Sequence, residues 1–135
     1  MATPRESMDA ELKAAVVPAL RLVGFKGSYP HFRRLSGPYV DLLTFQFDKW
    51  GGGFVLEITR ASAAGFTTHW GMLIPASKLT ALDLHPDSRR RIQPREGSDT
   101  EAWFRYDNRP VADVSKQVLD VLPDAEAWWA SRVEV

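Results

Sequence analysis

The sequence predicts an α+β protein: an antiparallel sheet of about four to six strands, with N-terminal and C-terminal helices packed on one face. Three observations predict this class. Apolar residues at helical spacing occupy both ends of the chain, alternating residues typical of strands occupy its middle, and the two kinds of segment do not alternate with each other. A parallel, doubly wound sheet would need such an alternation of strands and helices.

The first element expected is an amphipathic helix that starts after Ser7 and ends before Gly24. Ser7 has the chemistry of an N-cap, and Gly24 suits the position after a C-cap. Pro18 lies inside the helix and should kink it, because proline cannot donate a backbone hydrogen bond. The apolar stripe consists of Met8, Leu12, Ala15, Val16, Ala19, Leu20 and Val23.

Alternating patterns in the middle of the chain predict strands over residues 31–35, 39–47, 54–59, 68–74 and 102–106. The side chains expected to face the core are Leu43, Phe45, Phe47, Phe54, Leu56 and Ile58. The alternate positions are mostly polar, so we expect one face of the sheet to meet water or a partner. Residues 75–86 have no clear pattern, and residues 87–97 are predicted to form an arginine-rich loop.

Two glycine-containing segments are interpreted as turns. Ser36-Gly37-Pro38 is a turn signature between two predicted strands. Gly51-Gly52-Gly53 lacks the Lys-Ser or Lys-Thr ending of a phosphate-binding loop, and it leads into a strand instead of a helix. A hairpin turn is therefore the better interpretation of the glycine run.

The C-terminal third is predicted to be two helices. Asn108-Arg109-Pro110 is a good helix start, and valines at helical spacing follow it. Pro123 is expected to break the first helix, leaving a second short helix over residues 125–132. The valine stripe consists of Val111, Val114, Val118 and Val121.

Length and composition predict a single domain over residues 1–135, of which residues 1–6 are expected to be flexible. The chain has 135 residues, and 44% of them are hydrophobic, enough for one core. Lys and Arg number 17, as do Asp and Glu, so a net charge of zero provides no overall attraction to nucleic acid or an anionic membrane. We therefore expect neither as a partner.

The chain has no cysteine, which excludes disulfides, thiolate catalysis and cysteine-ligated metals. The segment Met1–Asp9 is polar, unlike a signal peptide, and no apolar run approaches the roughly 20 residues that span a bilayer. A cytoplasmic location is the expectation that remains.

Several short motifs occur along the chain in a specific order. They are Leu22-Val23-Gly24-Phe25-Lys26, Tyr29-Pro30-His31-Phe32-Arg33-Arg34, Leu43-Thr44-Phe45-Gln46-Phe47-Asp48-Lys49, His85-Pro86-Asp87-Ser88-Arg89-Arg90-Arg91-Ile92 and Trp103-Phe104-Arg105-Tyr106. In this order they resemble the DUF4304 family of bacterial proteins, over most of the chain. Two departures are Phe47-Asp48, where the family often has Lys-Ser, and Gln93, where it often has glycine. The resemblance implies a fold and a prokaryotic origin, and supplies no catalytic residues.

No motif commits the chain to a reaction. His31, His69 and His85 lack the spacing of metal ligands, and His85 between Asp83 and Asp87 is interpreted as a solvated loop residue. No nucleophile elbow or catalytic lysine motif occurs. We therefore predict no catalytic residues, no metal and no cofactor; enzyme activity stays open, with the balance against it.

The arginines are the most distinctive candidate site. Arg33 and Arg34 lie on a short strand and should point to opposite faces. If the arginine-rich loop folds over the sheet, its guanidinium groups could converge on a carboxylate or phosphate. The alternative is a solvated basic loop, balanced by Asp87, Glu96, Asp99 and Glu101. The candidate anion- or partner-binding set is Arg33, Arg34, Gln46, Arg89, Arg90, Arg91 and Trp103.

Trp128 and Trp129 are a second candidate, as an interface. Neighbours on a helix lie about 100° apart, so the two rings cannot both face one core, and exposed tryptophan is enriched at interfaces. The alternative is that both are partly buried at the helix edge.

Two classes of function follow. The first is a non-enzymatic protein-binding module, immunity- or adaptor-like, with another protein as its partner. The second is a small-molecule or anion-binding protein, with enzyme activity open, whose pocket lies between sheet and helices and uses Arg34, Gln46 and Arg90. A small anionic ligand would be its partner.

Overall fold

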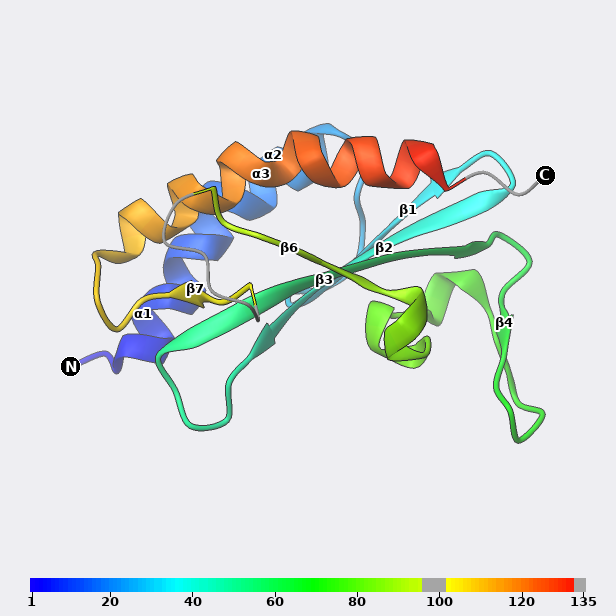
Figure 1. Ribbon diagram of the computed structural model, residues 1–135, viewed down its shortest axis with the longest axis horizontal. Helices are drawn as coiled ribbons and strands as arrows, with labels where there is room; N and C mark the ends of the chain where they lie inside the picture. The colour runs from blue at the N-terminus through cyan, green and yellow to red at the C-terminus, as the bar shows by residue number, and fades with distance from the viewer. Residues whose placement is uncertain (96–101, 133–135) are drawn as a thin grey trace.

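The computed structural model describes residues 1–95 and 102–132 and has the predicted α+β fold (Figure 1). The strands are β1 (His31–Ser36), β2 (Tyr39–Phe47), β3 (Gly53–Ser62), β4 (Phe66–Thr67), β5 (Leu73–Ile74), β6 (Arg90–Ile92) and β7 (Phe104–Arg105). The α-helices are α1 (Pro4–Glu11), α2 (Val17–Leu22) and α3 (Val111–Ser131). A π-helical turn, η1 (Leu12–Val16), joins α1 to α2, and the 3-10 helices are η2 (Ala76–Lys78), η3 (Ala81–Asp83) and η4 (Pro86–Ser88).

The main sheet is antiparallel, with five strands centred on β3. Its order is β1-β2-β3-β6, and β7 pairs with a separate stretch of β3. In the β2–β3 hairpin Phe45 lies opposite Leu56, so residues with the same predicted orientation share a face. β4 and β5 form a separate two-stranded sheet. β1 is an edge strand.

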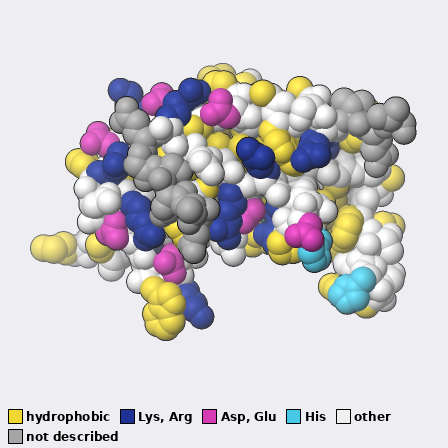
Figure 2. Space-filling model, viewed as in Figure 1, with side chains coloured by type: hydrophobic (Ala, Val, Ile, Leu, Met, Phe, Trp, Pro, Cys, Tyr) yellow, Lys and Arg dark blue, Asp and Glu magenta, His cyan; other side chains and the backbone are white. Residues whose placement is uncertain are grey.

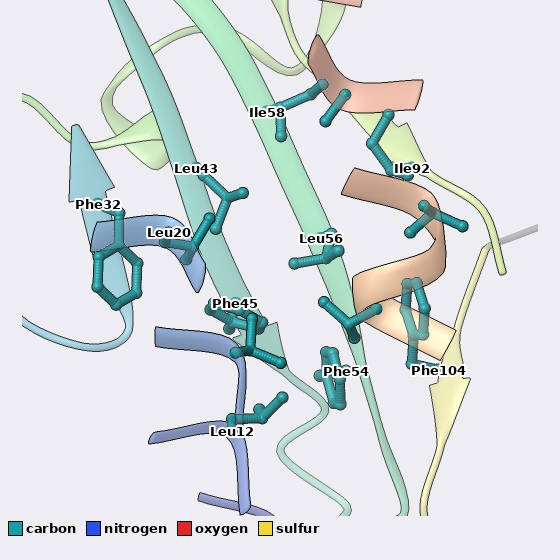
Figure 3. Close-up of a cluster of buried hydrophobic side chains, with 14 of the residues drawn as sticks. Leu12, Leu20, Phe32, Leu43, Phe45, Phe54, Leu56, Ile58, Ile92 and Phe104 are labelled. Carbon is teal, nitrogen blue, oxygen red and sulfur yellow. The ribbon is translucent and has the colours of Figure 1, made fainter. Parts of the chain in front are cut away.

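The α-helices all cover one face of the main sheet, as predicted (Figure 1). Figure 3 shows side chains from helices and strands meeting in the core. The predicted inward residues Leu43, Phe45, Phe54, Leu56 and Ile58 are all buried there. Phe47, predicted to face the core too, is half-buried and packs against its margin.

The other face of the sheet is also partly covered, contrary to the expectation of one open face. Val40 and Leu42 of β2 form a second core with Leu79, Ala81 and Leu84 from the 3-10 segment. The chain between residues 75 and 89 therefore serves as a cover. Each 3-10 helix has only three residues, so no period was available to predict it.

The N-terminal helix begins at Pro4, earlier than the predicted start after Ser7. Thr3 is the N-cap: its Oγ1 accepts from the N–H of Glu6, and Glu6 Oε1 accepts from the N–H of Thr3, both at 3.1 Å. Pro18 is accommodated by the wider π turn before it, in which the N–H of Val17 donates to the carbonyl of Leu12.

The prediction that Pro123 ends a helix is wrong, because α3 runs unbroken from Val111 to Ser131. Val121 and Ala125, on either side of the proline, are both buried against the sheet layer. Arg95 donates two hydrogen bonds, of 3.1 and 2.9 Å, to the carbonyl of Asp120 in the turn that Pro123 disturbs. Packing therefore outweighs the helix-breaking tendency of proline here.

Two strand predictions and one loop prediction need correction. Residues 68–74 are not one strand: β4 and β5 pair as a hairpin, and Gly71 takes a positive φ of 89° in its turn. Within the predicted loop 87–97, Arg90–Ile92 forms β6; residues 96 and 97 lie outside the described part. The predicted strand 102–106 is shorter, Phe104–Arg105.

Candidate functional site

Arg34 stands at the centre of an ion-pair network on the helix-covered side of the sheet. Its Nη2 lies 2.9 Å from Asp41 Oδ2, and its Nη1 and Nη2 lie 2.8 and 2.9 Å from the two carboxylate oxygens of Glu126 on α3. Arg60 Nε lies 2.7 Å from the other oxygen of Asp41, which is fully buried. The Arg34 guanidinium also stacks on Phe25, 4.5 Å from its centroid.

The positive charge of Arg34 is already neutralised by the carboxylates of Asp41 and Glu126. Burial alone would lower the pKa of Arg34, but hydrogen bonds to Glu126 and Asp41 outweigh it and raise the pKa above the ordinary arginine value. Two arginines and two carboxylates balance in this network. An added anion would have to displace a carboxylate, so the network fastens α3 to the sheet rather than offering an anion site.

Arg33 points to the opposite face, as predicted. Its Nε donates to the carbonyl of Leu79 in the 3-10 cover at 3.3 Å. Gln46 lies on the same face as Arg33, because the residues of β2 alternate and Gln46 is out of phase with Phe45. Arg90 pairs with Ile58 and lies on the helix side. Arg34, Gln46 and Arg90 therefore do not converge.

Arg89 and Arg91 lie on the face away from the α-helices. Arg91 Nε lies 2.9 Å from Glu57, whose side chain is nearly buried, and its guanidinium lies 5.9 Å from the Trp103 ring. The Nε of Arg89 is buried and finds no hydrogen-bond partner among the described residues. Of the acids predicted to balance this segment, Asp87 is exposed, and positions 96, 99 and 101 lie outside the described part.

Trp128 and Trp129 have different environments. Trp129 is 1% exposed, its Nε1 donates to the carbonyl of Thr59 at 2.9 Å, and it packs on Phe25 with ring centroids 5.2 Å apart. Trp128 is half-buried, with the Arg132 guanidinium 4.7 Å from its ring. Of the pair, only Trp128 reaches the surface.

A pocket of about 610 Å³ lies beside Trp128, where the end of α3 meets the β1–β2 turn and η4. Tyr39 lines it together with Arg60, whose guanidinium lies 4.6 Å from the Tyr39 ring. The other polar residues of its wall are Ser62, Asp87, Ser88, Ser131 and Arg132. Arg60 is engaged by Asp41, whereas Arg132 makes no ion pair within the described chain. Sequence reasoning did not identify this pocket, because its residues come from four separate segments.

The β4–β5 hairpin carries a cluster of exposed apolar side chains that sequence reasoning missed. Trp70, Met72 and Leu73 are 66, 56 and 60% exposed. The hairpin stands away from the body at the lower right of Figures 1 and 2. The signal that could have revealed it is Gly71, since a glycine between apolar residues marks a turn.

The turn of this hairpin is well ordered. Thr68 is buried, and its N–H donates to the carbonyl of Met72 at 2.8 Å. Its Oγ1 accepts from the N–H of Met72 at 3.0 Å, and its carbonyl accepts from the N–H of Gly71 at 2.9 Å. The His69 and Trp70 rings pack edge to face at 4.7 Å. The backbone that carries the apolar side chains is therefore held by hydrogen bonds.

Neither a cluster of metal-ligating side chains nor a membrane-spanning helix occurs among the described residues. No group of three or more His, Asp or Glu side chains there could hold a metal ion. His31 Nδ1 instead lies 2.9 Å from Thr44 Oγ1. Within residues 1–95 and 102–132, no helix is both long enough and apolar enough to cross a membrane.

Comparison with known proteins identifies one family. The model of a domain of unknown function, DUF4304, matches residues 16–132. No curated protein and no solved structure matches the chain. The match covers both candidate surfaces, the hairpin and the pocket beside Trp128, and assigns neither of them a role.

Proposed function

The chain belongs to the DUF4304 family, and we propose from its geometry that it is a protein-binding module whose β4–β5 hairpin engages the partner. The observation that carries the proposal is the exposure of Trp70, Met72 and Leu73 on a projecting, hydrogen-bonded turn. The binding is non-enzymatic, of the immunity or adaptor kind. We place it in the bacterial cytoplasm, the location expected from the sequence and from the bacterial family that it resembles.

The distribution of charged residues also supports the β4–β5 hairpin as the surface that binds the partner. Residues 61–77, which contain the hairpin and its base, include no Asp, Glu, Lys or Arg, although 25% of the chain is charged. The centres of protein interfaces are depleted in charge and enriched in aromatic residues and methionine. Elsewhere on the face in view in Figure 2, positive and negative side chains are interspersed.

The hydrogen bonds of the turn also support a binding role for its exposed side chains. Because hydrogen bonds to Thr68 already fix the turn, a partner would lose little conformational entropy when it contacts Trp70 and Met72. Contacts made by a preordered aromatic side chain are the kind that dominate binding energy. The hairpin therefore has the character of a hot spot.

The test is crosslinking in the native cell with a photoreactive residue at position 70, followed by affinity purification with the Trp70→Ala, Met72→Ala double variant. We expect one stoichiometric protein to crosslink at position 70 and to be lost from the double variant. Trp50→Ala is the matched control, because Trp50 is also an exposed tryptophan on a hairpin loop. Retention of every partner by the double variant would contradict the proposal.

A second candidate function rests on the pocket beside Trp128. Two aromatic rings, Tyr39 and Trp128, line it, and each is stacked by a guanidinium. Arg132, which has no ion pair within the described chain, would attract a small planar anion here, although the carboxylate of Asp87 also lines the pocket. Native mass spectrometry of the purified protein would test it: a bound small molecule lost from Arg132→Ala supports this function, and a ligand-free protein opposes it.

A further inference from the structure

We propose that the open edge of β1 binds an extended, acidic peptide segment of a partner protein by strand addition. This surface adjoins the base of the β4–β5 hairpin but does not include Trp70, Met72 or Leu73, and the inference does not depend on the proposed role of the hairpin. Three observations carry it: an unpaired backbone position at Leu35 on the strand edge, a groove beside it, and a local excess of positive charge.

Of the three outward-facing backbone positions of β1, His31, Arg33 and Leu35, two are already engaged within the described residues. The His31 N–H donates to the carbonyl of Ser28 at 2.8 Å. Arg33 exchanges both of its backbone hydrogen bonds with Lys26, at 2.7 and 2.9 Å, so its N–H and C=O point away from β2. Leu35, two residues further, has the same orientation because backbone groups alternate along a strand. No contact with Leu35 comparable to the Lys26–Arg33 bridge occurs in the described chain.

The side chain at this edge is apolar. Leu35 is 70% exposed, which is unusual for a leucine on an edge strand, where charged residues and proline normally prevent pairing with other chains. An incoming strand would pair with the free N–H and C=O of Leu35 and shield its side chain.

A groove of about 640 Å³ runs beside this edge. Its lining includes Leu35 and Val40 on the strands, Ala63 next to β3, and Pro75 and Ala76 at the start of the 3-10 cover. Val40 is fully buried, and Ala76 packs against the second core, so the floor is preformed. An extended peptide could place alternate side chains in such a groove while its backbone pairs with β1.

The groove is basic although the whole chain is neutral. Lys26 and Arg33 line it, Lys78 follows directly after its last residue, and none of the three has a carboxylate partner in the described part of the chain. Arg34, which also lines it, is neutralised by Asp41 and Glu126.

Asp83 adds a negative charge in this region, since it acts on His31, next to Arg33. Its hydrogen bond from the N–H of Thr80, at 2.8 Å, leaves that charge in place, but Lys26, Arg33 and Lys78 outnumber it by three to one. The uncompensated charge is therefore positive, and complementarity selects a peptide with Asp or Glu. A small anion would leave the strand edge unpaired, and nucleic acid has no group that continues a sheet.

Selection of random heptapeptides displayed on phage against the full chain tests the inference. We expect enriched sequences in which Asp or Glu alternates with Val, Ile or Thr. A synthetic copy of the selected peptide should protect the Leu35 amide from hydrogen exchange and should bind roughly five- to tenfold more weakly to Lys26→Glu. Lys116→Glu, the same charge change at an exposed position on α3, should bind normally.

Two outcomes would overturn the inference: no enrichment over an unrelated protein, or a selected peptide whose binding leaves Leu35 exchange and the Lys26→Glu affinity unchanged. Full competition by inorganic phosphate or by a short DNA strand would also oppose it. The Trp70→Ala, Met72→Ala variant should still bind the peptide, so failure at the β1 edge and failure of the hairpin proposal give different results.

Discussion

Arg34 on β1 forms a bidentate ion pair with Glu126 on α3, with nitrogen–oxygen distances of 2.8 and 2.9 Å. The two residues lie 92 positions apart in the sequence. The same guanidinium contacts Asp41 on β2. One side chain thus joins the edge strand, its neighbour and the last helix. The parallel geometry of the Arg34–Glu126 pair is the strongest form of an arginine–carboxylate contact.

Removing Arg34 should destabilise the fold. The buried Asp41 would retain only Arg60, and breaking a buried ion pair by removing one partner costs about 3 kcal/mol or more. We expect Arg34→Ala to lower the free energy of unfolding by about 3 kcal/mol, measured by urea denaturation.

Arg95→Ala is the control for Arg34→Ala, because Arg95 also binds α3 through Asp120 and Asp124 but is mostly exposed. It should cost under about 1 kcal/mol. Equal effects of the two variants would show that the Arg34 network has no special role in stability.

The hairpin of β2 and β3 shows what the sequence could predict. Alternation along residues 39–47 and 54–59, with glycines between, predicts the inward set and the hairpin, whereas the register that places Phe45 opposite Leu56 comes from the structure. The family resemblance was confirmed for the same reason, since its motifs follow these strands and turns. The opposite orientations of Arg33 and Arg34 likewise follow from the two-residue period.

The partners of these arginines could not be predicted. Nothing local to Arg34 indicates that Glu126 lies beside it, because that contact depends on how α3 crosses the sheet. The same limit applies to Pro123: its intrinsic preference predicts a break, and only tertiary packing of Val121 and Ala125 overrides it. The 3-10 cover was missed because its apolar residues have no regular spacing.

The adjacent tryptophans should differ sharply in their contributions to stability. Trp129 fills the core and donates to the carbonyl of Thr59, so Trp129→Ala should cost about 3–5 kcal/mol. Trp128 is half-buried, and Trp128→Ala should cost about 1 kcal/mol. Urea denaturation followed by circular dichroism measures both, and a larger effect at Trp128 would contradict the assigned orientations.

Replacing the proline inside α3 should stabilise the protein. Pro123 cannot donate the hydrogen bond that a helix interior requires, and Pro123→Ala restores that donor. We expect a gain of about 1 kcal/mol, less than the full helix-interior penalty, because proline also restricts the unfolded chain. Thermal unfolding measures the gain.

Pro110→Ala is the contrasting variant for Pro123→Ala. Pro110 is the N-cap of α3, where no intrahelical donor is needed. We expect Pro110→Ala to bring no gain in stability. A decrease in stability on Pro123→Ala would mean that α3 needs the bend that proline introduces.

His31 should make stability depend on pH. Burial lowers the pKa of His31 below its ordinary value of 6.5, with Asp83 acting to raise it and Arg33 acting to lower it. Its Nδ1 also lies within hydrogen-bond distance of Thr44. Because the unfolded chain binds the proton more readily, the stabilising effect of the neutral ring is complete above pH 6.5 and declines as pH falls below that value.

Urea denaturation at several pH values should therefore show a loss of stability from pH 7.5 to pH 5.5 that is smaller in His31→Gln, where glutamine cannot titrate. His85→Gln provides the control, since His85 is an exposed histidine whose ring lies next to Asp87 in solvent. It should keep the wild-type pH dependence. If His31→Gln and the wild type lost stability in parallel, the proton would be taken up at another group, and the burial of His31 beside Thr44 would have no consequence for the acid sensitivity of the fold.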